Sequence, residues 1–127
     1  MAFEHSALAT WYEAVPLDEG LMREVLDPEV EFNVCAGWPN GGSFQGHDGV
    51  LSEFFPEASK AWERLKPEVE EVIEAGDRSI VRGRYVGVAA GGTPFSLEFV
   101  HIWTIRDGKI ASLHQVADSV LLSDARG

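Results

Sequence analysis

The stretch Phe95–Ala117 has the sequence FSLEFVHIWTIRDGKIASLHQVA, which predicts two paired strands. Side chains of a strand alternate between the two faces of a sheet, and the odd-numbered residues from Phe95 to Trp103 are large and apolar except for His101. Asp107-Gly108, between the two halves of the stretch, is a tight-turn signal. The pattern therefore places one titratable imidazole on a buried apolar face.

A buried imidazole needs either a hydrogen-bond partner or a function. The commoner arrangement is a core histidine satisfied by a neighbouring carbonyl or hydroxyl group. The alternative is a polar contact at the bottom of a ligand pocket. Antiparallel pairing across the short turn brings Gln115 next to His101, and its amide would then hydrogen-bond one ring nitrogen and fix the tautomer.

Two more strands are predicted before this hairpin, over Val69–Glu74 and Ser79–Val88. The turn signals Gly76-Asp77 and Gly91-Gly92 separate the successive strands. Three hairpins in a row predict an antiparallel meander.

The first half of the chain predicts helices and one strand. Apolar residues three and four positions apart predict a helix over Ser6–Val15, ended by Pro16, and a second short helix follows with Asp18 as its N-cap. Alternation over Val30–Cys35 predicts a strand. The glycine-rich stretch Ala36–Gly46 predicts a loop without an element of its own.

Apolar residues four positions apart predict a third helix from Val50 to Trp62, which Pro56 should break or bend. Helices followed by antiparallel strands are typical of an α+β domain with helices packed on one face of a curved sheet. A chain of 127 residues is enough for one domain with one core, and we expect residues 1–127 to form it.

Composition narrows the classes of partner. The formal net charge is −11, which opposes binding to nucleic acid or to an anionic membrane. Cys35 is the only cysteine, and the histidines show no metal-ligand spacing. No glycine loop has a phosphate-binding pattern. We therefore expect no metal and no cofactor, and the lack of a signal-like N-terminus predicts a cytoplasmic protein.

The order of these elements, together with Asp27-Pro28, GHDGV at 46–50, Gly76-Asp77 and HIWTIRDGKI at 101–110, resembles the SnoaL-like and ketosteroid isomerase-related branch of the nuclear transport factor 2-like superfamily. The resemblance implies a cone-shaped, cystatin-like fold, in which a mostly antiparallel sheet wraps a pocket that N-terminal helices close. Members include isomerases, cyclases, dehydratases, epoxide hydrolases and domains without demonstrated activity, and they are often dimers through the outer face of the sheet.

Residue by residue, the resemblance departs from ketosteroid isomerase. Phe32 stands where that family has its aspartate base, so steroid isomerisation is not expected. The tyrosine that donates to the developing oxyanion matches Tyr12, and the second aspartate matches His101. SnoaL-type cyclases pair a histidine at that place with an aspartate on the last strand, where this chain has Gln115.

We therefore expect a pocket that binds a small, largely apolar or aromatic molecule. His101 would donate or accept a proton in an isomerisation, cyclisation or dehydration, with Gln115 and Tyr12 as the other catalytic candidates. One alternative is a non-catalytic ligand-binding or dimerisation domain, and another is a structural adaptor whose own aromatic side chains fill the pocket. A homodimer is expected in each case. The expected ligand-binding residues are Trp11, Phe32, Phe54, Phe99, Trp103 and Leu113.

Each of three further polar side chains has either a role at the pocket or a commoner role at the protein surface. His47 could overhang the pocket mouth, although a solvent-exposed histidine at a helix start is commoner. Arg82 and Arg84 could hold a carboxylate or enolate, although arginine more often pairs with surface acids.

Overall fold

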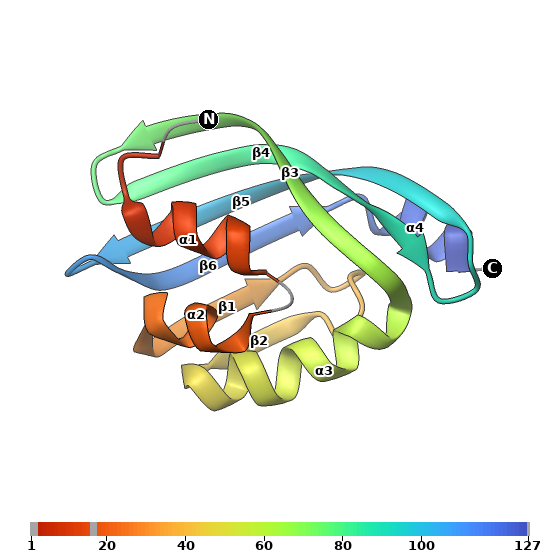
Figure 1. Cartoon of the computed structure of the whole chain (residues 1–127), viewed down its shortest axis with the longest axis horizontal. Coiled ribbons are helices and arrows are strands. Elements are labelled where there is room, and N and C mark those ends of the chain that lie inside the picture. Colours follow the sequence, from red (N-terminus) through yellow and green to blue (C-terminus); the bar gives the residue numbers. More distant parts are fainter. Residues whose placement is uncertain (1–2, 16–17, 127) are drawn as a thin grey trace.

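Six strands form one curved sheet in the order β2-β1-β6-β5-β4-β3 in the computed structural model, which describes residues 3–15 and 18–126 (Figure 1). Neighbouring strands are antiparallel except for β1 and β6, which are parallel. The predicted meander is confirmed as β3 to β6. The strands are β1 (Leu26–Val34), β2 (Gly42–Gln45), β3 (Trp62–Ala75), β4 (Arg78–Ala89), β5 (Pro94–Arg106) and β6 (Lys109–Ala117).

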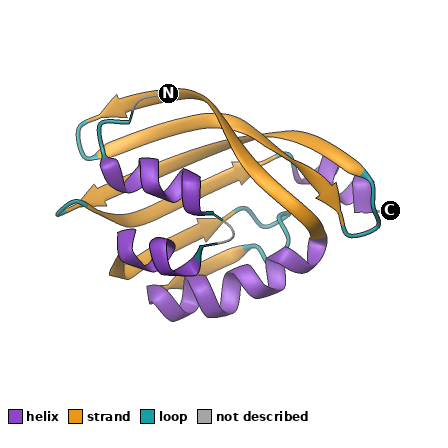
Figure 2. Cartoon of the chain, in the orientation of Figure 1, coloured by secondary structure: helices purple, strands orange, loops and turns teal. Residues whose placement is uncertain are grey.

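Helices cover one face of this sheet, as Figure 2 shows for the first three, while the last helix lies against β4 and β5 near the C-terminus. This arrangement confirms the α+β class. No helix in the described part of the chain is both long and apolar enough to cross a membrane. The α-helices are α1 (Ser6–Ala14), α2 (Glu19–Val25), α3 (Phe55–Ala58) and α4 (Ser119–Arg126).

Local signals explain where the second helix and the first strand begin. The Asp18 carboxylate accepts a hydrogen bond from the Leu21 N–H at 3.1 Å, so the predicted N-cap of α2 is confirmed. Strand β1 begins at Leu26, four residues earlier than Val30, and it continues through Pro28. The β1–β6 register is irregular between Leu26 and Glu31, so the missing N–H of Pro28 costs no ladder bond there.

One expectation for the middle of the chain is wrong, and another is confirmed in part. The stretch Ala36–Gly46 contains strand β2, which pairs with β1 through Phe32 and Phe44. The third helix is three short segments, because a π-helical stretch (Asp48–Phe54) and a 3₁₀ turn (Ser59–Ala61) flank α3. Pro56 lies in the first turn of α3, where its missing N–H is tolerated, and Trp62 begins β3 rather than ending a helix. A helical region divided near Pro56 was correctly predicted, and only its end at Trp62 is wrong.

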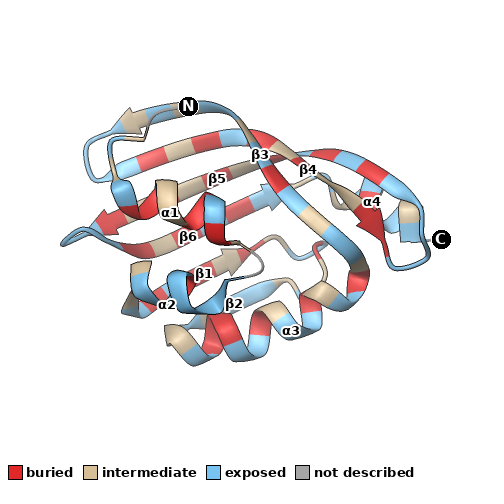
Figure 3. Cartoon of the chain, viewed as in Figure 1, coloured by how far each residue is buried: buried red, intermediate tan, exposed pale blue. Residues whose placement is uncertain are grey.

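The core lies between the helices and the inner face of the sheet (Figure 3). Along β5 the odd-numbered residues from Phe95 to Ile105 are buried, and the even-numbered residues are exposed or half-buried. His101 is among the buried residues, and it pairs with Gln115 in the register of β5 and β6. The alternation and the pairing predicted for this hairpin are therefore confirmed.

Candidate functional site

His101 lies at the centre of the inner face, 3% exposed, and both of its ring nitrogens have a tyrosine partner. The Tyr12 hydroxyl, from α1, is 2.5 Å from Nδ1, and the Tyr85 hydroxyl, from β4, is 2.6 Å from Nε2. The indole N–H of Trp103 donates to the Tyr12 hydroxyl at 2.8 Å. Two hydroxyl groups therefore satisfy the buried imidazole.

Gln115 is opposite His101 in the ladder, but its amide contacts Tyr85 instead. The amide nitrogen donates to the Tyr85 hydroxyl at 3.4 Å, and the amide oxygen accepts from the Cys35 N–H at 3.4 Å. The expected bond from Gln115 to the imidazole is absent, because the Tyr85 hydroxyl occupies that ring nitrogen. Gln115 reaches His101 only through Tyr85.

Burial keeps this whole group of side chains neutral. It lowers the pKa of His101 to about 3, since no nearby charge compensates the loss of water around an imidazolium. Burial also raises the pKa of Tyr12 and of Tyr85 well above the usual value for a phenol. At neutral pH the network consists of a neutral imidazole between two neutral hydroxyls.

Aromatic packing holds the imidazole in place. The Phe99 ring stacks on His101 with centroids 4.0 Å apart, and the Trp103 ring meets it edge-on at 5.6 Å. Gly83, the ladder partner of Phe99, leaves room for that ring. A Cβ at Gly83 would collide with the carbonyl oxygen of Glu68 and lie 2.9 Å from the Phe99 ring. The glycine is therefore required by close packing.

A small cavity of about 50 Å³ adjoins this network. Its polar side is made of Tyr85, His101 and Gln115, and the rest of its lining is apolar. The engineered apolar cavity that admits benzene measures about 150 Å³, so the cavity in its present form is too small for an aromatic ring. Aromatic side chains of the protein itself fill most of the interior.

Four of the expected wall residues line the cavity, namely Trp11, Phe32, Phe54 and Leu113. The other two, Phe99 and Trp103, do not line it; both pack against the His101 ring. Tyr12 is not in the lining either, and it contacts His101 from the helix side. The lining residues that sequence reasoning missed include Trp38, Phe55, Trp62 and Tyr85.

Among the residues that the sequence did not predict, Tyr85 is the one that belongs to the hydrogen-bond network of His101. Its odd number places it on the same face of β4 as Val81, which pairs with His101. Arg82 and Arg84 occupy the alternate positions of this strand and favour its solvated face, so the inward direction of Tyr85 was accessible to prediction. Its contact with Nε2 was not, because Tyr85 pairs with Leu97 and reaches His101 only past the Phe99 ring.

The other polar candidates lie away from the cavity. His47 Nε2 is 2.9 Å from the Leu26 carbonyl oxygen, which ties the start of the π-helical stretch to β1. Arg82 pairs with Glu70 and Glu71, on the outer face of the sheet. Arg84 pairs with Glu98 and donates to the Ser96 hydroxyl, on that same outer face. For both arginines the commoner use, pairing on the surface, is confirmed.

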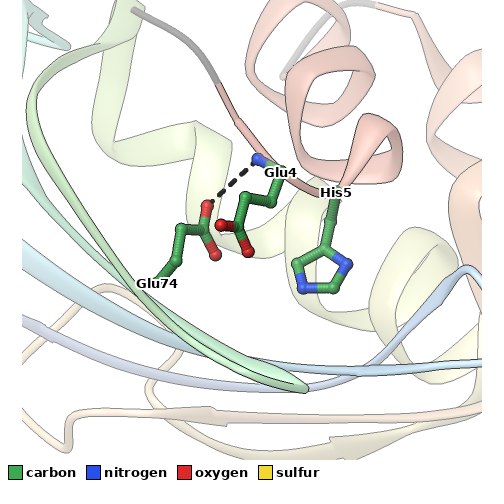
Figure 4. A group of neighbouring side chains, drawn as sticks. All are labelled: Glu4, His5 and Glu74. Carbon is green, nitrogen blue, oxygen red and sulfur yellow. Dashed lines mark hydrogen bonds between the residues drawn. The ribbon is translucent and has the colours of Figure 1, made fainter.

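One group of potential metal ligands, absent from the sequence patterns, forms near the N-terminus (Figure 4). Ligand atoms of Glu4, His5 and Glu74 lie within 4.8 Å of one another. Two of the side chains already have protein partners, since His5 Nε2 bonds to the Gly76 carbonyl oxygen at 2.9 Å and Glu74 accepts from the Glu4 N–H and from Ser79. These bonds attach the segment before α1 to the β3–β4 hairpin, and we assign the cluster that structural role.

Comparison with known proteins places this arrangement in a family. The model of the SnoaL-like domain matches residues 10–113, and the chain belongs to that family. No curated protein shows a significant sequence match. The fold expected from the resemblance, a nuclear transport factor 2-like sheet with packed helices, is confirmed by similar solved structures.

Three of these structures illustrate the similarity. TerC, crystallised with polyporic acid, is 29% identical, with 95% of each chain covered and a TM-score of 0.88. A nuclear transport factor 2-like protein of unknown function from Burkholderia pseudomallei K96243 is 25% identical, with 98% of each chain covered and a TM-score of 0.88. Another such protein, from Burkholderia thailandensis E264, is 26% identical over 100% of this chain and 99% of its own, with a TM-score of 0.87.

Proposed function

We propose that this protein binds a small, largely apolar aromatic molecule in the cavity beside Tyr85, His101 and Gln115. The observation that carries the proposal is the division of the lining, since aromatic walls meet one polar side made only of neutral groups. Such a lining favours an uncharged ring system with few polar atoms. The similarity to TerC, which was crystallised with polyporic acid, supports a small-molecule ligand.

Binding requires the cavity to widen, and Trp38 is the wall best placed to move. It lies between β1 and β2, outside any strand, where it packs on Tyr85 and Trp62 with ring centroids 5.0 and 5.9 Å apart. The side chain of Asn40, in the same segment, donates to the carbonyl oxygens of Glu53 and Phe54. Asn40 fixes the end of the segment, so rotation of the Trp38 side chain would open the cavity without unpairing β1 from β2.

Catalysis of an isomerisation, cyclisation or dehydration would proceed without a cofactor and through Tyr85. Both nitrogens of His101 are bonded to tyrosines, so His101 would influence a substrate proton only by way of the Tyr85 hydroxyl. Binding without turnover is the second candidate. It is favoured because the lining contributed by the described residues contains no carboxylate to serve as a base.

A homodimer through the outer face of the sheet remains a prediction. Val116 on β6 and Leu121 on α4 are 49% and 45% exposed, and they border one shallow depression on the surface. Burial of these side chains against a second copy would remove apolar surface from water. Sedimentation velocity would detect the dimer, and Val116→Glu is expected to dissociate it.

Titration with polyporic acid, followed by tryptophan fluorescence and calorimetry, tests the proposed pocket. Leu113→Phe fills the cavity from β6, and His114→Phe adds a similar ring at the neighbouring exposed position. We expect the wild type and His114→Phe to bind alike, and Leu113→Phe to bind about tenfold more weakly or worse. Equal binding by all three proteins would place the ligand elsewhere. If polyporic acid and a panel of aromatic ketones all failed to bind the wild type, the proposed function would be wrong.

A further inference from the structure

The hydrogen bonds around His101 have a direction, and it is set at Trp103. An indole N–H only donates, so the Tyr12 oxygen accepts the bond from Trp103. The remaining partner of that hydroxyl among the described residues is His101 Nδ1, 2.5 Å away. The Tyr12 proton therefore points at Nδ1, which accepts it.

The direction continues through the ring. A neutral imidazole carries one N–H, and with Nδ1 as acceptor that proton lies on Nε2. Nε2 then donates to the Tyr85 oxygen at 2.6 Å. The opposite tautomer would aim two N–H groups at the Tyr12 oxygen and leave the Tyr12 proton buried without an acceptor, which is destabilising.

Gln115 directs a second donor at the same oxygen. Its amide oxygen faces the Cys35 N–H, so its NH₂ group faces the Tyr85 hydroxyl. Turning the amide over would set its NH₂ group against the Cys35 N–H, with two donors facing each other. The Tyr85 oxygen thus accepts from both Nε2 and Gln115. Within the described residues its own proton has no acceptor.

We propose that Tyr85 presents its hydroxyl proton to the cavity and that the ligand accepts it with a carbonyl or quinone oxygen. This inference rests on the proposed function, since it assigns the polar contact within the same pocket. Tyr85, His101 and Gln115 all border the cavity, so the unpaired proton lies on the side where a ligand would lie. A hydroxyl group whose oxygen accepts two hydrogen bonds donates its own proton more strongly. This strengthens the preference for a ligand that accepts the Tyr85 proton.

The directed network selects among aromatic compounds. It offers a ligand the Tyr85 hydroxyl as a donor, while the lone pair of Nδ1 is taken by Tyr12 and the Gln115 oxygen accepts from Cys35. A ketone or quinone oxygen matches that donor and brings no proton of its own. A phenol or alcohol without a carbonyl group lacks that acceptor and would bury its hydroxyl proton without a partner, which disfavours it. The expected ligand is therefore a flat aromatic carbonyl compound, and His101 is a positioning residue that acts through Tyr85.

Nitrogen NMR of the histidine side chains in the unliganded wild type tests the direction of the network. Protein labelled with ¹⁵N at histidine would show the proton of the His101 ring on Nε2 and a bare Nδ1. A proton on Nδ1 would overturn the inference, because Tyr85 would then donate to the ring. This measurement needs no ligand and no variant.

A matched pair of probes tests the ligand class. Fluorenone and fluorene share one ring skeleton, and only fluorenone has a carbonyl oxygen. We expect the wild type to bind fluorenone about tenfold more tightly than fluorene, the value of one well-formed hydrogen bond. Tyr85→Phe should abolish that preference, so that it binds fluorenone and fluorene with equal affinity. The infrared carbonyl stretch of bound fluorenone should lie at lower frequency in the wild type than in Tyr85→Phe.

The outcomes separate this inference from the proposed function. Equal binding of fluorenone and fluorene to the wild type would overturn the role of Tyr85 and leave the aromatic pocket standing. If neither probe nor polyporic acid bound, the pocket itself would fail, and the inference with it. A preference for fluorenone that survives in Tyr85→Phe would assign the carbonyl contact to another donor. If Tyr85→Phe did not fold, the tautomer in the wild type would decide.

Discussion

Arg84 and Tyr85 are neighbours on β4, yet they face opposite sides of the sheet and satisfy their polar groups differently. Arg84 lies on the outer face, where it pairs with Glu98 at 3.6 Å beside water. Tyr85 lies on the inner face, where neutral groups share hydrogen bonds out of contact with water. Water can replace a partner lost on the outer face, whereas on the inner face it can do so only beside the cavity. The inner network should therefore be much the more sensitive to substitution.

Gly83→Ala should have the largest effect, because the new methyl group meets the Glu68 carbonyl oxygen and the Phe99 ring on the inner face. We expect the free energy of unfolding to fall by about 3 to 4 kcal/mol, or the protein not to accumulate in folded form. Gly91→Ala is the control, since a Cβ there would meet only the Arg126 carbonyl oxygen, at 3.9 Å. Urea unfolding measures both. Equal stability of the two variants would contradict the close packing at Gly83.

The pH dependence of the stability should reveal that the buried imidazole of His101 is neutral in the folded protein. The pKa of His101 is lowered to about 3 in the folded protein, from an ordinary value of 6.5. Between pH 3 and pH 6.5 the imidazole therefore binds a proton in the unfolded chain but not in the folded protein. The stabilisation is complete above about pH 6.5 and is lost as the pH falls towards 3, by about 3 kcal/mol at pH 4. The groups bonded to the ring, Tyr12 and Tyr85, do not titrate in this window because burial raises their pKa.

Urea unfolding of the wild type and of His101→Gln, each at pH 7 and pH 4, measures this loss. The glutamine can still donate and accept hydrogen bonds but does not titrate. The carboxylates contribute equally in both proteins, so the difference between the two losses reports His101. An identical pH dependence would mean that the imidazole is protonated or exposed in the folded state.

Tyr12 lies at the closed end of the network, outside the cavity lining, and Tyr85 lies at the end beside the cavity. Replacing each tyrosine in turn should distinguish these two ends. Tyr12→Phe leaves the Trp103 N–H and His101 Nδ1 without partners, and we expect a loss of about 2 kcal/mol in stability. Tyr85→Phe leaves its partners beside the cavity, which has room for water, and we expect a loss of about 1 kcal/mol. Thermal and urea unfolding give both values. The opposite order would place the closed end of the network at Tyr85.

The outer face should give the smallest effect. Arg84→Ala removes an exposed pair with Glu98 and the bond to Ser96, and we expect the stability to change by less than about 1 kcal/mol. The effect should shrink further in high salt, because salt screens exposed pairs. A loss as large as that of Tyr12→Phe would remove the contrast between the two faces.

The sequence predicted what depends on short-range patterns. The meander and the inward direction of His101 follow from alternation and turn residues, which act over a few positions. The pairing of His101 with Gln115 also depends on a register shift between Thr104 and Ile105. Strand β2 could not be foreseen, because Gly42–Gln45 has little intrinsic strand preference and becomes a strand by pairing with β1. The contact between Tyr85 and His101 was also missed, because it depends on the absence of a side chain at Gly83 and on how the Phe99 ring packs.

A crystal structure of the protein soaked with fluorenone would show directly whether Tyr85 donates to a ligand carbonyl group. We expect a rotated Trp38 and a fluorenone molecule between the aromatic walls. Its oxygen should lie within hydrogen-bond distance of the Tyr85 hydroxyl, with the bonds from His101 to both tyrosines intact. Fluorenone bound only on the outer face, with Trp38 still packed on Tyr85, would contradict it.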